Sequence, residues 1–275
     1  MCFRQPTVQR TVTPITSLQN PKVKAARALH RRRQREREGK ILLEGVRLIA
    51  DAVDAGYVPE LLFYTESALE NEQAAALVES LQEVAWAVTD EIMAHLADTV
   101  TPQGLVAVVP RPALPWPPAV TLLLLCDGVR DPGNMGTLIR AAAGAGVDGI
   151  VVPRGNVDVW SPKVLRAAMG AHFHVPLRAG VEWAEVPALL TGLRVRLAEA
   201  RAATRYFEVD WSLPSALIVG GEASGVGETS ARLAQERISI PLARDIESLN
   251  VGVAAAVILF EARRQRLERT AHEHS

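Results

Sequence analysis

Hydrophobic and polar residues alternate with two different periods along the first hundred residues of the chain. Apolar residues at every third or fourth position indicate helices, and short apolar runs between turn residues indicate strands. Together they predict a small layered α/β domain. Asn20 is a typical N-cap and Pro21 a typical first helical residue, so a helix is expected to begin there. The predicted helices span 20–34, 45–56, 71–81 and 89–97, and the predicted strands span 40–44, 60–64, 83–88 and 104–110.

Prolines then interrupt this pattern and mark a boundary. The stretch PRPALPWPPAV cannot support regular structure and favours a stiff, extended linker. We therefore predict a first domain over 1–109, a linker over 110–118 and a second domain over 119–275. Beyond the linker, the predicted strands span 120–126, 149–152, 172–177, 194–199, 216–221 and 237–242, and the predicted helices begin near 134 and at 162, after the cap Ser161, and span 249–268.

Length and composition agree with two globular domains and disfavour several other classes of protein. The chain has 275 residues, of which 48% are hydrophobic and 22% are charged, as in ordinary folded proteins. No apolar run approaches the roughly 20 residues of a membrane span. The N-terminus lacks the apolar core of a signal peptide. We therefore expect a cytoplasmic protein without a membrane partner.

Metal and disulfide chemistry have little support in the sequence. Cys2 and Cys126 are the only cysteines, too few for a disulfide framework or, alone, a zinc site. The predicted strand over 172–177 would point His172 and His174 to the same side. Two histidines without a third ligand are a weak metal signal, so no metal site is predicted.

The net charge of −1 hides a segregated distribution of charge. Nine basic and two acidic residues lie between Lys22 and Lys40, whereas 51–98 holds eleven acidic residues and no Lys or Arg. A basic cluster can contact phosphates even on a neutral protein, because electrostatic potentials decay within about 10 Å at physiological salt. A solvated helix face is the simpler interpretation of the same residues. The candidate RNA-binding residues are Lys22, Lys24, Arg27, Arg31, Arg32 and Arg33.

A glycine pattern in the second domain matches a dinucleotide fingerprint but stands in the wrong context. GAGVDG, at 144–149, fits G-x-G-x-x-G, yet such a fingerprint must follow a strand and open a helix. Here the glycines close a predicted helix and lead into a strand, so Gly144 or Gly146 is better interpreted as a helix C-cap. The pattern of strands and helices alone favours a Rossmann-like fold. A Rossmann-type dehydrogenase is disfavoured, because this sequence lacks a glycine fingerprint after its first strand.

Three segments that follow predicted strands carry the candidate chemistry. DPGNMGTLIR holds Asn134 and Arg140. GGEASGVG lets a ligand approach the backbone closely, although Glu222 disfavours a phosphate there because like charges repel. IPLARDIESLN places Ser248 and Asn250 at a predicted helix start, where capping is the structural alternative.

Together these segments resemble, in order and spacing, the three motifs of the SpoU/TrmH family of RNA ribose 2′-O-methyltransferases. The motifs are DPGNMGTLIRAAAGAGVDGIVV, IVGGEASGVG and ISIPLARDIESLNVGVAAAVILFEA, and the resemblance covers about 119–268. The segments ITSLQNPKVKAARAL, ILLEGVRLI and TPQGLVAVV are similar to the L30e-like RNA-binding domain that precedes the catalytic domain in ribosomal-RNA members.

The resemblance implies an α/β catalytic domain of the SPOUT superfamily, closed by a deep trefoil knot that ordinary connection rules would exclude. It also implies S-adenosylmethionine as the cofactor and a homodimer with the RNA site near its interface. The implied substrate is RNA, and the L30e-like domain favours 23S ribosomal RNA over tRNA. A tRNA 2′-O-methyltransferase and a catalytically inactive RNA-binding relative are the alternatives.

Matching positions give the expected site residues. Catalysis and substrate binding are expected at Asn134, Arg140, Glu222, Ser248 and Asn250, and cofactor contacts at Gly220, Gly221, Ile240, Leu242 and Leu249. The resemblance gives Arg140 the role of general base. Because an arginine side chain ordinarily stays protonated, Arg140 could equally stabilise the forming alkoxide or grip a phosphate. Asn250 and Ser248 are expected to orient the ribose or Arg140.

Overall fold

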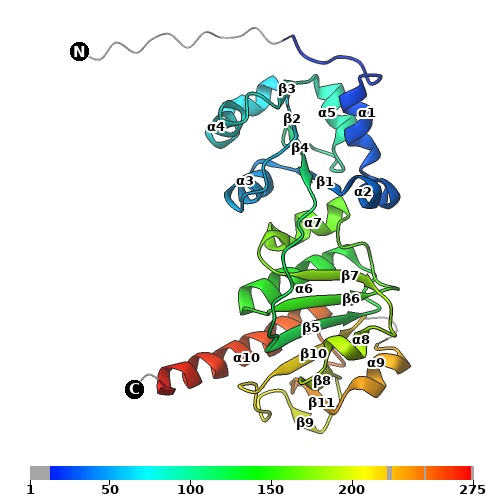
Figure 1. Ribbon diagram of the computed structural model, residues 1–275, viewed down its shortest axis with the longest axis vertical. Coiled ribbons are helices and arrows are strands. Elements are labelled where there is room, and N and C mark those ends of the chain that lie inside the picture. Colours follow the sequence, from blue (N-terminus) through cyan, green and yellow to red (C-terminus); the bar gives the residue numbers. More distant parts are fainter. Residues whose placement is uncertain (1–12, 222–224, 245, 274–275) are drawn as a thin grey trace, which may run out of the picture. The chain divides into compact units, whose positions relative to one another are not determined.

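The computed structural model describes residues 13–221, 225–244 and 246–273 (Figure 1). The chain divides into two compact units, Met1–Pro110 and Arg111–Ser275. Between 111 and 121, a stretch rich in proline, no helix or strand is found. Among the residues that the structure describes, no helix combines the length and apolar character that a membrane span requires.

The N-terminal unit is built on a four-stranded sheet in the order β1-β4-β2-β3. The central strand β4 (Leu105–Pro110) pairs antiparallel with β1 (Lys40–Glu44) and with β2 (Leu61–Tyr64), and β2 pairs parallel with β3 (Ala85–Ala87). Its helices are α1 (Pro21–Ala28), α2 (Arg32–Glu38), α3 (Val46–Asp54), the 3-10 helix η1 (Glu66–Glu70), α4 (Glu72–Ser80) and α5 (Asp90–Leu96). The predicted layered α/β unit is confirmed.

The helix predicted over 20–34 is two helices, α1 and α2. Its start is confirmed, since the Asn20 side chain accepts a hydrogen bond from the Lys22 amide at 2.9 Å. The break begins at Leu29, the C-cap of α1, which is buried in the core with Val23 and Ala26. The buried guanidinium of Arg35 donates to the carbonyls of Leu29 and His30, at 2.6 and 2.8 Å. Tertiary contacts therefore satisfy the backbone at a turn that helix propensity alone does not predict.

The C-terminal unit is built on a seven-stranded sheet in the order β7-β6-β5-β10-β8-β11-β9. All six pairings between its described strands are parallel. The strands are β5 (Leu122–Asp127), β6 (Gly149–Pro153), β7 (Leu177–Val181), β8 (Arg194–Ala198), β9 (Thr204–Arg205), β10 (Ser215–Gly220) and β11 (Glu236–Ser239). Apolar residues of β5, β6 and β10 are almost fully buried, as expected of parallel strands covered on both faces. The trefoil knot stays a prediction.

Two long helices cover one face of this sheet and run parallel to each other (Figure 1). Gly252 approaches Thr137 near the start of both helices, and Gly146 approaches Arg263 further along. They are α6 (Pro132–Ala145) and α10 (Val251–Glu273), and the shorter helices of the unit are α7 (Pro162–Ala168), α8 (Val186–Leu189), α9 (Glu228–Leu233) and the 3-10 helix η2 (Ala171–Phe173). Gly146 caps α6 with φ of 76°, so the C-cap interpretation of the glycine pattern is confirmed.

The strand predicted over 172–177 is wrong. Residues 171–173 form η2, and β7 begins only at Leu177. His172 is buried, and its Nε2 lies 2.8 Å from the Val159 carbonyl oxygen, whereas His174 is exposed. The two rings therefore do not share a face, and no group of metal-binding side chains is found among the described residues. Ser161 does precede α7, but its side chain makes no capping hydrogen bond to a described residue.

Candidate active site

The carboxyl ends of the neighbouring strands β5 and β10 form the centre of the candidate site. Gly220 pairs with Asp127 at the last position of the two strands. Strands β6 and β7 extend the sheet on one side of this pair, and β8, β11 and β9 extend it on the other. In open parallel sheets, ligands bind outside the carboxyl ends of the strands where the strand order reverses.

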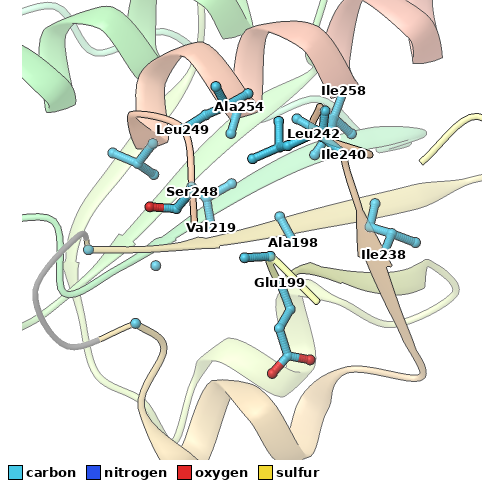
Figure 2. Close-up of a pocket in the computed structure, with 15 residues that line it drawn as sticks. Ala198, Glu199, Val219, Ile238, Ile240, Leu242, Ser248, Leu249, Ala254 and Ile258 are labelled. Carbon is cyan, nitrogen blue, oxygen red and sulfur yellow. The ribbon is translucent and has the colours of Figure 1, made fainter. Parts of the chain in front are cut away.

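A cavity of about 210 Å³ opens beside this pair, at the carboxyl ends of β10, β8 and β11 (Figure 2). The side chains of Ile240 and Leu242 lie on one side of it, and Val219 and Ala198 lie on the other. Glu199 also belongs to the lining, and its carboxylate points away from the apolar side chains. The lining residues are Ala198, Glu199, Ala200, Val219, Gly220, Gly221, Gly225, Ile238, Ile240, Leu242, Ser248, Leu249, Val251, Ala254 and Ile258.

Two glycines in the cavity lining, Gly220 and Gly221, are required because another backbone segment passes close to each. A Cβ on Gly221 would lie 2.2 Å from the carbonyl oxygen of Gly128, and one on Gly220 would lie 2.6 Å from the carbonyl carbon of Gly225. Any side chain at either position would force the two loops apart. Glu222, the third residue of the predicted motif, lies outside the described residues.

A buried carboxylate holds the glycine segment against β5. Asp127 accepts hydrogen bonds from the Gly227 amide, at 2.6 Å, and from the Ser230 hydroxyl. Its own carbonyl accepts from the Gly221 amide at 2.9 Å. Burial and the neighbouring Asp127 raise the pKa of the Cys126 thiol to about 12, so Cys126 is not a nucleophile at neutral pH.

The starts of α6 and α10 are joined by a pair of asparagines. The Asn250 amide donates to Asn134 Oδ1 at 2.7 Å, while Asn250 Oδ1 accepts from the amides of Gly252 and Val253 at 3.0 and 3.3 Å. Asn250 therefore caps α10 and also contacts α6. The capping interpretation is therefore confirmed, and the place of Asn250 in the site stays a prediction.

Arg140 stands apart from this pair. It lies on α6, six residues after Asn134, which corresponds to about 9 Å along a helix axis. Its side chain is exposed and makes no hydrogen bond or ion pair with any residue that the structure describes. Gly144, one turn further on the same face, approaches the ring of Phe260 of α10. The structure therefore brings Asn134, Ser248 and Asn250 together beside the cavity and leaves Arg140 on the neighbouring helix face.

Sequence reasoning missed Asn156, whose side chain fixes the loop before α6. Asn156 Oδ1 accepts from the Val129 amide at 2.7 Å, and its Nδ2 donates to the carbonyls of Cys126 and Pro153, at 3.1 and 2.8 Å. Three hydrogen bonds from one amide thus join the ends of β5 and β6. Asp127 was also missed, although its place directly after an apolar strand was a usable signal.

The predicted RNA-binding residues lie on α1, on α2 and in the turn between them. Three of the six have partners within the unit. The Lys22 ammonium lies 4.3 Å from the Trp86 ring centroid, Arg27 donates to the Ala97 carbonyl at 3.5 Å, and Arg32 pairs with Glu36 at 2.7 Å. The exposed cations Lys24, Arg31 and Arg33 make no such contact with a described residue.

Comparison with known families matches both units of the chain. Residues 121–260 match the SpoU rRNA Methylase family, and residues 20–107 match the MRM3-like substrate binding domain. The chain therefore belongs to the SpoU rRNA methylase family, and the resemblance stated from its motifs is confirmed.

Individual relatives and a solved structure agree with this family. The mouse rRNA methyltransferase 3, mitochondrial, is 35% identical, over 84% of this chain and 69% of the relative. The 23S rRNA (guanosine(2553)-2′-O)-methyltransferase RlmP of Bacillus subtilis is 33% identical, over 90% of this chain and 98% of the relative. The crystal structure of an AdoMet-bound rRNA methyltransferase from Sinorhizobium meliloti superposes with a TM-score of 0.78 and 31% identity, covering 92% of this chain and 98% of that one.

Proposed function

We propose that this protein transfers the methyl group of S-adenosylmethionine to a ribose 2′-hydroxyl of large-subunit (23S) ribosomal RNA. The observation that carries the proposal is the cavity at the carboxyl ends of β8, β10 and β11. Residues of the second and third motifs line it, and Asn250 of the third motif bonds to Asn134 of the first. Membership of the SpoU family, the 2′-O-methyltransferase name of the Bacillus relative and the AdoMet-bound Sinorhizobium structure support it.

The cavity suits the cofactor in its chemistry. Ile238, Ile240, Leu242 and Ile258 offer an apolar surface for a flat adenine ring. Gly220, Gly221 and Leu249 also line the cavity, and the two glycines let the cofactor approach the backbone closely. When bound, S-adenosylmethionine supplies a methyl group that its sulfonium already activates. The residues of the protein then need to position the acceptor oxygen and stabilise the charge that develops on it.

Asn134, Ser248 and Asn250 position the target ribose in this proposal. Their side chains lie where α6 and α10 begin, next to the cavity. Bound S-adenosylmethionine would supply the methyl group and be released as the neutral thioether, and the proton of the 2′-hydroxyl would pass to solvent. We assign Arg140 the electrostatic role at the developing alkoxide or the adjacent phosphate, because an arginine ordinarily stays protonated. Glu222, outside the described residues, keeps its proposed place in the same site.

We propose a homodimer formed by the exposed face of α10. Val253, Phe260 and Leu267 are 48%, 49% and 58% exposed and follow one another at intervals of seven residues. Residues at this spacing share one helix face, so they form an apolar stripe, which soluble proteins rarely leave uncovered. Arg140 lies one turn before Gly144, which contacts Phe260. Dimerisation through this stripe places Arg140 at the boundary between two subunits.

The N-terminal unit selects the RNA in this proposal. We propose an L30e-like RNA-binding domain over 1–109, a linker over 110–118 and the catalytic domain over 119–275. The match to a substrate-binding domain and the exposed cations Lys24, Arg31 and Arg33 support this assignment. A cytoplasmic location is proposed from the bacterial relatives, although similar mitochondrial proteins exist.

Binding and transfer assays separate this function from its alternatives. We expect isothermal titration to show binding of S-adenosylmethionine, and labelled methyl to pass from it to a 23S rRNA transcript. No cofactor binding would favour a catalytically inactive RNA-binding protein. Methyl transfer to tRNA but not to 23S rRNA would favour the tRNA alternative.

A further inference from the structure

A second cavity of about 380 Å³ adjoins the cofactor cavity. The two share Ala200, Ile240 and Leu242 in their linings. Its remaining wall comes from the last residue of β11, from the segment between β11 and α10, and from Arg201 beyond β8.

Two arginines give this second cavity a basic rim. Arg201 and Arg244 both line it, and both are exposed. Neither forms a hydrogen bond or ion pair with another residue of 13–221, 225–244 or 246–273. Glu247 is the acidic residue of the described lining. Both arginines line the same cavity, and neither has a partner among the described residues. Together they offer the hydrogen-bond donors that bind an anionic oxygen group.

The backbone at Arg244 is strained. Its φ is 64°, and Met169 is the other non-glycine residue with positive φ in the described part of the chain. Glycine adopts this left-handed conformation without steric cost, whereas a residue with a Cβ does not. What arginine provides here and glycine lacks is the guanidinium group. Strain retained at a binding loop is a sign of a functional side chain.

We propose that Arg244 and Arg201 form a subsite for a backbone phosphate of the RNA next to the target nucleotide. The proposal rests on the proposed function, since it places the phosphate beside the cavity assigned to the cofactor. Ile246, 57% exposed on the same segment, offers an apolar contact for the adjoining sugar or base. The anionic group could alternatively be the carboxylate of the cofactor, so the test must distinguish these two sources.

The test compares Arg244→Gly, Arg244→Ala and Arg244→Lys with the wild-type protein. Arg244→Gly removes the guanidinium and the strain, whereas Arg244→Ala removes only the guanidinium. We expect both to raise the Kd and KM for a 23S rRNA transcript about tenfold, the effect of losing one charge-assisted contact. We also expect the salt slope of RNA binding to fall by about one. Arg244→Lys should recover part of the affinity, and Arg244→Gly should melt no earlier than the wild type.

Isothermal titration with S-adenosylmethionine and a matched control complete the design. Arg194 is exposed at the opposite end of β8, so Arg194→Ala should leave the Kd and KM for RNA unchanged. Wild-type RNA affinity in both Arg244→Gly and Arg244→Ala overturns the subsite. An equal loss of affinity for S-adenosylmethionine and for RNA also overturns the subsite. That result would assign Arg244 to the carboxylate of the cofactor. Failure of the wild type to bind cofactor or methylate RNA would instead overturn the proposed function.

Discussion

Asn250 joins two roles in one side chain, and a single substitution separates them. Asn250→Asp keeps the oxygen that caps α10 but loses the amide that donates to Asn134. We expect the single-turnover rate of methyl transfer to fall roughly 100-fold, because small errors in positioning are costly in such reactions. Cofactor affinity should stay within a few-fold of wild type by isothermal titration.

Thermal unfolding serves as the control for that variant. Because the cap is retained, Asn250→Asp should melt within a few degrees of the wild type, whereas Asn250→Ala should lose about 1 kcal/mol of stability. Wild-type transfer rates in Asn250→Asp would show that the bond to Asn134 has no part in catalysis. A loss of cofactor binding alone would place Asn250 in the cofactor site.

His172 makes the stability of the protein depend on pH. Burial lowers the pKa of its imidazole to about 4, from an ordinary value of 6.5. Between these values the unfolded chain binds more protons than the folded one, so stability falls as the pH falls from about 6.5 towards 4. We expect His172 to account for about 3 kcal/mol of that loss.

Urea unfolding of His172→Gln between pH 7.5 and pH 4.5 measures this contribution. Glutamine can still donate to the Val159 carbonyl but does not titrate, so the unfolding free energy should decline less steeply with pH than in the wild type. His174→Gln, at the exposed histidine nearby, is the matched control. Identical pH slopes in the wild type and in His172→Gln would contradict the assignment.

At the scale of elements, α10 carries both a core face and the proposed dimer stripe. Phe260→Glu puts a charge into the middle of the stripe, and burying an unpaired charge opposes association. We expect light scattering to show a dimer for the wild type and a monomer for this variant at the same concentration. Val58→Glu, at an apolar residue of the N-terminal unit that is 59% exposed, should remain dimeric. A monomeric wild type would contradict the proposed dimer.

Element types followed from the sequence where periodicity and caps agreed. The start of α1 at Asn20 and Pro21 and the end of α6 at Gly146 needed only local chemistry. The division of 20–34 into two helices depends on the buried guanidinium of Arg35, and the 3-10 turn at His172 depends on its contact with Val159. Both contacts join residues that sequence periodicity treats as independent, so the pattern could not predict them.

The sequence pointed to segments of the candidate site but not to the contacts between them. Position after a strand singled out the segments that hold Asn134, Ser248 and Asn250, but capping was the simpler interpretation of the last two. Their expected roles came from the family resemblance and stay predictions. The direct bond between Asn134 and Asn250 spans 116 positions of sequence, so only the fold could reveal it. The three-bond role of Asn156 and the left-handed backbone of Arg244 likewise exist only in the folded chain.

At the scale of the whole molecule, the proposal needs the N-terminal unit to bind RNA through charge. Lys24, Arg31 and Arg33 lie on α1, on the turn after it and on α2, and their exposed side chains contact no partner among the described residues. Replacing all three by alanine removes these positive charges. We expect weaker binding to 23S rRNA and a salt slope shallower by roughly 2–3, since each phosphate contact adds about 0.7–0.9. Arg37→Ala, at an arginine paired with Glu38 on α2, should change the slope little.

Salt titration of RNA binding by fluorescence anisotropy measures both slopes. Unchanged slope and affinity in the triple variant would mean that this helix face is only solvated, the simpler interpretation of the basic cluster. Reduced affinity with an unchanged slope would point to a local loss of structure, which thermal unfolding of the variant can detect.

Mapping of ribose methylation in 23S ribosomal RNA tests the central claim most directly. The map is made from cells that carry the gene, from cells that lack it, and from deleted cells supplied with Asn250→Asp at equal protein level. We predict at least one nucleotide that is 2′-O-methylated with the wild-type protein and unmethylated in the other two. Identical maps in all three would contradict the proposal that this protein methylates large-subunit ribosomal RNA.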